Sequence, residues 1–118
     1  MPGLPIRTPV DISTVRSVLH RVMDGPNYTP NFRTQAAATL TALAEFILSS
    51  NYAGTIDIIT INQAGRKGIA FHSHITGSVN LQIHYDQLVQ ELAAVADEVE
   101  YFIGRNHAAI TARIWSAD

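Results

Sequence analysis

The 118-residue sequence contains no cysteine, and only 15% of its side chains are charged. Without cysteine the chain has no disulfide framework, no zinc–thiolate site and no thiol nucleophile. Eight basic residues stand against ten acidic ones, which excludes the positive surface of a general nucleic-acid binder. The first residues lack the basic and apolar regions of a signal peptide, and no apolar run reaches the ~20 residues of a membrane span. These absences predict a cytoplasmic protein that binds neither nucleic acid nor membrane.

What the sequence does have is apolar residues, which make up 47% of the chain and predict a single globular domain over residues 1–118. Apolar side chains recur at helical spacing in three segments. The first helix is expected to be capped by Asp11 or Ser13 and to end within residues 24–27. The second is expected from about Thr34 to Leu48, and the third over residues 87–99.

Strand patterns occupy most of the remaining chain. Prolines confine a short edge strand to residues 4–9, and β-branched runs predict a hairpin of residues 54–62 and 67–75. A second hairpin is expected from residues 98–104 and 108–115. The resulting order, β-α-α-β-β-α-β-β, lacks the regular alternation of a doubly wound fold. We therefore expect an α+β, two-layer α/β sandwich with a mixed, mostly antiparallel sheet and helices on one face.

Several polar side chains could carry chemistry. His72 and His74 are two apart on a predicted strand, hence on one face, and His84 could approach them. We expect no metal site there, because few further ligands accompany them. Arg66 and Lys67 at a hairpin tip are interpreted as solubility features rather than a phosphate clamp. For Trp115, near the end of the last strand, packing is the default interpretation.

Glu45 raises the main question, because it lies inside the apolar helical run LTALAEFILSSNYAG. The segment TALAEFILSSNYAGTIDIITINQAGRKGIAF resembles the N-box helix, following strand and hairpin of the anti-sigma factor switch kinases, serine-protein kinases of the GHKL (Bergerat-fold, histidine-kinase-like) ATPase superfamily. The similarity continues in order over nearly the whole chain. It implies a GHKL-like sandwich with an ATP and magnesium site.

The resemblance also implies roles for individual residues. Glu45 matches the glutamate that polarises the attacking group, and Ser49 stands where the family has its magnesium-binding asparagine. Asn51 is six residues after Glu45, about 240° further around a helix, so it does not simply substitute. Gly77 keeps the first glycine of the adenine-binding turn, but Ile75 replaces the aspartate that accepts the adenine amino group.

The glycine-rich lid of the family has no counterpart before Leu88, because residues 78–87 contain no glycine. We therefore interpret the chain as a degenerate member with no cofactor. The expected function is that of a non-catalytic regulatory protein that binds a STAS-type antagonist domain or a sigma factor. One alternative is an active ATP- and magnesium-dependent protein kinase using Glu45, Ser49 or Asn51, and Gly77. Another is a structural or self-associating subunit, so a homo-oligomer stays open.

Overall fold

The computed structural model describes residues 3–25, 28–49, 53–76, 81–104 and 106–116, with the backbone alone for residues 49, 81–85 and 103. Its helices and strands follow one another in the predicted order: β1 (Leu4–Ile6), α1 (Pro9–Val22), α2 (Pro30–Ser49), β2 (Ala53–Gln63), β3 (Arg66–Thr76), α3 (Leu81–Val95), β4 (Glu98–Ile103) and β5 (His107–Trp115). The α+β class is confirmed. None of the helices in these ranges has the length and hydropathy that a membrane crossing requires.

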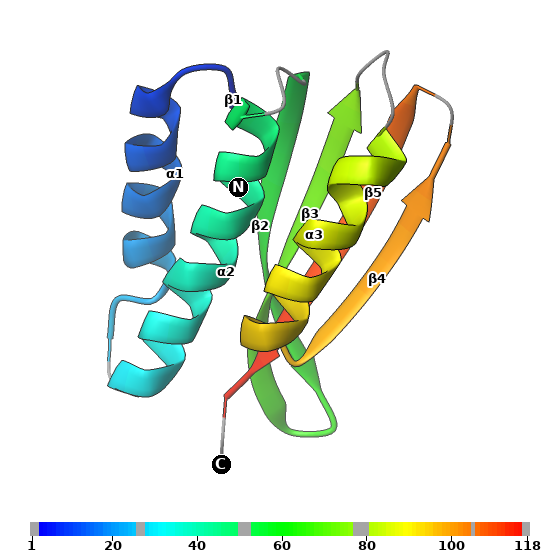
Figure 1. The fold of residues 1–118 in the computed structure, drawn as a ribbon. Helices are drawn as coiled ribbons and strands as arrows, with labels where there is room; N and C mark the ends of the chain where they lie inside the picture. The colour runs from blue at the N-terminus through cyan, green and yellow to red at the C-terminus, as the bar shows by residue number, and fades with distance from the viewer. Residues whose placement is uncertain (1–2, 26–27, 50–52, 77–80, 105, 117–118) are drawn as a thin grey trace.

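The five strands form one sheet in the order β1-β2-β3-β5-β4 (Figure 1). All four neighbouring strand pairs are antiparallel, so the predicted mixed sheet is wrong for the described part of the chain. The reason lies after α3, where β4 runs in the direction of β3 but occupies the outer position, and β5 returns between them. The predicted edge position of the first strand is confirmed, since β1 pairs only with β2.

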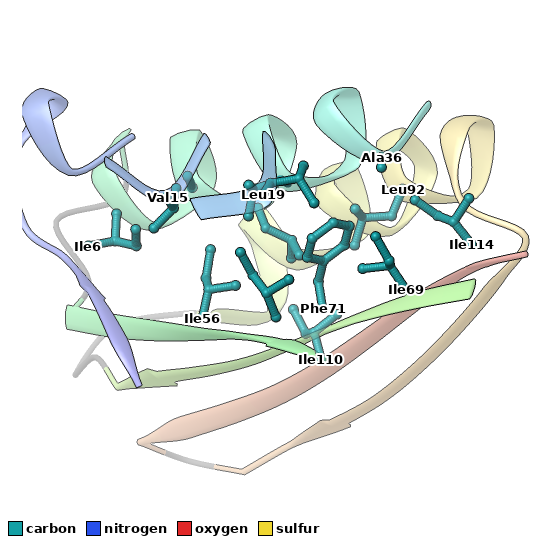
Figure 2. Packing of buried hydrophobic residues seen from close by; sticks show 14 of the residues in the cluster. Ile6, Val15, Leu19, Ala36, Ile56, Ile69, Phe71, Leu92, Ile110 and Ile114 are labelled. Carbon is teal, nitrogen blue, oxygen red and sulfur yellow. The ribbon is translucent and has the colours of Figure 1, made fainter. Parts of the chain in front are cut away.

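All three helices cover the same face of the sheet, as predicted (Figure 1). The core fills the space between the two layers, where alternate residues of the central strands point toward the helices (Figure 2). From the sheet come Ile56 and Ile58 of β2, Ile69, Phe71 and Ile75 of β3, and Ile110 and Ile114 of β5. Leu40, Leu43 and Ile47 of α2 meet them from the helix layer. Each such side chain contributes about 1.5–3 kcal/mol by leaving water.

The N-terminus of α1 differs from the expectation. Neither Asp11 nor Ser13 is the N-cap; Thr8 holds that position and Pro9 begins the helix. Proline suits the first helical position because its missing N–H would have no partner there. Asp11, three residues after the cap, accepts hydrogen bonds from the backbone N–H groups of Arg7 at 2.7 Å and Thr8 at 2.9 Å. These two donors lower the pKa of Asp11.

The other two helices also begin earlier than predicted. Helix α2 starts at Pro30, and the Thr29 hydroxyl accepts the N–H of Phe32 at 3.2 Å. Helix α3 starts at Leu81 rather than at residue 87, and it ends at Val95 because the chain enters β4 at Glu98. The early start of α3 leaves only residues 77–80 between it and β3. This short connection bears directly on the predicted nucleotide site.

Candidate functional site

Glu45 lies on the outer side of α2. The helix buries Leu40, Leu43, Ala44 and Ile47 against the sheet, whereas Glu45 is exposed. Among the described residues, Glu45 forms no hydrogen bond or ion pair, and the salt bridge they contain joins Arg113 to Glu100 at 3.0 Å. An exposed carboxylate without an ion-pair partner is typical of an ordinary surface side chain.

The structure describes less of the other residues to which the resemblance gives a role. Ser49 is the last residue of α2, while Asn51 and Gly77 lie outside the described residues. Their described neighbours in the chain, Ala53 and Thr76, are direct partners across β2 and β3. The C-terminal end of α2 and the C-terminal end of β3 therefore lie at the same end of the sandwich (Figure 1).

Ile75, at the position that resembles the adenine-binding aspartate, belongs to the core. Its side chain is 0% exposed and points toward the helix layer. Its cross-strand partners are Gly54 on β2 and Ala108 on β5, neither of which carries a polar side chain. Position 75 therefore provides no hydrogen-bond acceptor on its side chain.

Gly54 has a packing role. A Cβ atom there would lie 2.9 Å from Cδ1 of Ile47 and 3.1 Å from the carbonyl oxygen of His74. The glycine lets α2 approach the start of β2 closely. Gly54 is the last residue of the YAG sequence that contributed to the resemblance. The close contact between helix and sheet explains why this residue is a glycine.

Among the described residues, no helix lies on the second face of the sheet (Figure 1), and we call it the open face. Its residues include Thr55, Asp57, Ile59 and Ile61 of β2, Ala70, His72 and His74 of β3, and Thr111, Arg113 and Trp115 of β5. At its centre the predicted histidine pair does share a face. Nε2 of His72 lies 3.0 Å from Nε2 of His74, and Nδ1 of His72 lies 2.6 Å from the Thr111 hydroxyl.

Thr111 was missed by sequence reasoning, because its contact with His72 depends on the pairing of β3 with β5. The tautomers of the two rings determine which histidine donates across the Nε2–Nε2 contact. The side chain of His84 is not described. In the described part of the chain, no three metal-ligating side chains gather in one place.

Trp115 is packed at one end of the open face and is only 8% exposed. Its indole lies over Gly68, where a Cβ atom would come within 2.4 Å of the Ile114 carbonyl oxygen and 3.0 Å of the tryptophan ring. The Arg66 guanidinium stacks over the ring at 4.8 Å, and the indole N–H donates to the Glu98 carboxylate. The packing interpretation of Trp115 is confirmed, and Arg66 takes part in that packing.

Lys67, next along the chain, lines a hollow of about 290 Å³ together with Tyr28, Thr60, Ile61 and Asn62. This hollow lies at the hairpin end of β2, far along the strand from Ala53 and from the segments of the predicted nucleotide site. In the described residues, Glu45 and Lys67 therefore do not come together into one site. When compared with models of protein families and with curated proteins, the sequence matches none of them.

Proposed function

We propose that the protein is a non-catalytic regulator that acts by binding another protein, on a scaffold related to that of the anti-sigma switch kinases. The observation that carries this proposal is the complete burial of Ile75. In the related kinases, the matching residue is an aspartate that binds adenine. Here the position packs against the helix layer beside Gly54 and Ala108, and it provides no acceptor for a base.

Two further features support the same proposal. Residues 77–80 are all that separates β3 from α3, so the chain has no length for a loop that wraps three phosphates. Glu45 lies on α2 and is exposed, and none of the described side chains forms an ion pair with it. A catalytic base is generally held by a partner that adjusts its proton affinity.

The partner class follows from the resemblance, which favours a STAS-type antagonist domain or a sigma factor. The test is titration of the purified chain with each candidate purified from the same organism, monitored by calorimetry with and without ATP and magnesium. We expect saturable binding of one candidate at the same affinity in both conditions. Glu45→Ala serves as the matched variant and should bind equally well.

The catalytic alternative makes the opposite prediction for the same samples. Incubation with ATP and magnesium would then place phosphate on a serine of the partner, and Glu45→Ala would abolish the transfer. Phosphoserine formation that depends on Glu45 would refute the proposal. Failure of both candidates to bind in either condition would refute the partner class.

A further inference from the structure

The histidine pair of the open face lies on the central strand of the sheet. His72 and His74 belong to β3, which pairs with β2 on one side and with β5 on the other. Ser73, between them, is fully buried on the opposite face of the strand. The backbone that carries the two rings is therefore held on both sides, and both side chains leave it in the same direction.

The two rings bring two nitrogen atoms close together. Nε2 of His72 and Nε2 of His74 are 3.0 Å apart, and the ring planes are nearly perpendicular, at 85°. Imidazole nitrogen is the commonest protein ligand for transition-metal ions. Because each bond from such a nitrogen to the ion is about 2.0–2.1 Å long, atoms at this separation are close enough to bind the same ion.

The pair is accessible to solvent. His74 is exposed and His72 is half-buried. The residues directly opposite His74 are Thr55 on β2 and Ala109 on β5, and neither of them is charged. An ion can therefore approach His74 from the solvent without repulsion from these neighbours, and the exposed ring can turn by the amount that coordination requires.

Thr111 orients the less exposed ring. Its hydroxyl lies 2.6 Å from Nδ1 of His72, across the pairing of β3 with β5. When Nδ1–H of His72 donates to this hydroxyl, Nε2 keeps its lone pair and is the atom that can bind a metal. Metal-binding histidines generally donate their second ring N–H to an oxygen atom, which fixes both the tautomer and the ring orientation.

The nearby carboxylates are engaged in other contacts. Asp57, opposite His72 on β2, accepts the N–H of Gly3. Glu100 on β4 forms an ion pair with Arg113. Within the described residues no third metal-ligating side chain joins the histidines. An ion bound to this pair would therefore keep water in its remaining positions.

The spacing of the two nitrogen atoms favours ions whose neighbouring ligands are at right angles. With bonds of about 2.0–2.1 Å, a separation of 3.0 Å corresponds to an angle of about 91–97° at the ion. A tetrahedral ion, with an angle of about 109°, would need nitrogen atoms about 3.3–3.4 Å apart. Square-planar or tetragonal coordination is typical of Cu²⁺ and Ni²⁺, whereas structural Zn²⁺ sites are tetrahedral.

We propose that His72 and His74 bind a divalent transition-metal ion of right-angled geometry, Cu²⁺ or Ni²⁺, and that Thr111 positions His72 for it. The sequence alone favours no metal here, because few further ligands accompany the pair. The distance between the nitrogen atoms and the contact with Thr111 come from the structure. The inference is independent of the proposed function, which requires no metal.

The test is calorimetric titration of the full chain with CuCl₂, NiCl₂ and ZnCl₂ at neutral pH. We expect one Cu²⁺ per chain with a dissociation constant on the order of 1–10 μM, and Zn²⁺ bound about tenfold more weakly or less. His74→Ala removes an exposed ligand and should weaken Cu²⁺ binding about tenfold or more, as should His72→Ala. His20→Ala, which removes an exposed histidine of α1, should leave the affinity unchanged.

Two further variants test the positioning role of Thr111. Thr111→Val removes the hydroxyl but keeps both ligands, and it should weaken Cu²⁺ binding about tenfold. Thr111→Ser keeps the hydroxyl and should bind like the wild type. Electron paramagnetic resonance of the Cu²⁺ complex provides a second readout, because two imidazole ligands give a nitrogen splitting that His74→Ala should reduce to that of one.

Several results would overturn the proposal. A wild-type chain that binds neither Cu²⁺ nor Ni²⁺ below about 1 mM has no such site. Binding that neither His72→Ala nor His74→Ala weakens takes place elsewhere on the chain. Zn²⁺ bound as tightly as Cu²⁺ contradicts the right-angled geometry, and unchanged affinity in Thr111→Val contradicts the role of Thr111.

Discussion

Replacing Ile75 by aspartate gives the chain the residue that binds adenine in the kinases that its sequence resembles. The variant tests whether position 75 belongs to the core or faces a ligand. The wild-type side chain is fully buried between Gly54 and Ala108 on the sheet. Losing that apolar contact costs about 2 kcal/mol. The new carboxyl group has no donor among these neighbours, which costs about 1–3 kcal/mol more even if the group is protonated. We expect Ile75→Asp to destabilise the fold by about 3–5 kcal/mol in total.

The assay is urea denaturation followed by the fluorescence of Trp115, the single tryptophan of the chain. Two control variants show that the cost depends on burial. Ile75→Val keeps the position apolar and should cost about 0.5–1.5 kcal/mol. Ile59→Asp, at a residue of the open face that is 45% exposed, should cost about 1 kcal/mol or less.

The same denaturation experiment is then repeated in the presence of ATP and magnesium. A ligand present at one hundred times its dissociation constant stabilises a protein by about 2.7 kcal/mol, and we expect no such gain for either the wild type or Ile75→Asp. If Ile75→Asp is as stable as the wild type within about 1 kcal/mol and gains stability from ATP, position 75 faces a nucleotide pocket and our reasoning is wrong.

Three further predictions concern single positions. The pKa of Asp11 is lowered, so its carboxylate stabilises the fold at neutral pH, and this stabilisation is lost as the pH falls through the lowered value. Asp11→Asn should therefore reduce the stability at pH 7. In urea denaturation at a series of pH values, the difference from the wild type should shrink toward about pH 2. Gly68→Ala should cost about 1–3 kcal/mol in the same assay, because its Cβ would meet the Ile114 carbonyl oxygen at 2.4 Å and the Trp115 ring at 3.0 Å; an unchanged stability would mean that β5 moves away freely. Glu45→Ala should change the stability by no more than about 0.5 kcal/mol, because Glu45 is exposed and unpaired within the described residues; a larger loss would reveal an interaction of this carboxylate.

The local spacing of apolar residues in the sequence was enough to predict the order of the helices and strands. The spacing of Leu40, Leu43 and Ile47 predicts the buried face of α2, and the same spacing predicts that Glu45 is exposed. Helix starts were less predictable, because competing capping residues stand close together. Thr8 followed by Pro9 begins α1, although aspartate and serine, as at Asp11 and Ser13, are preferred to threonine as N-caps.

Contacts between residues of neighbouring strands could not be predicted, because they depend on the strand register, which sequence periodicity does not determine. The meeting of His72 with Thr111, and of Gly68 with Trp115, depends on how β3 aligns with β5. The motif resemblance and the packing against Ile47 each account for a glycine at position 54, but only the structure shows the packing.

The most direct test of the central claim is calorimetric titration of the full chain with ATP and magnesium. The burial of Ile75 and the short connection from β3 to α3 predict no saturable binding up to about 1 mM nucleotide. Saturable binding in the micromolar range, abolished when Glu45→Ala and Asn51→Ala are combined, would contradict the loss of the nucleotide site.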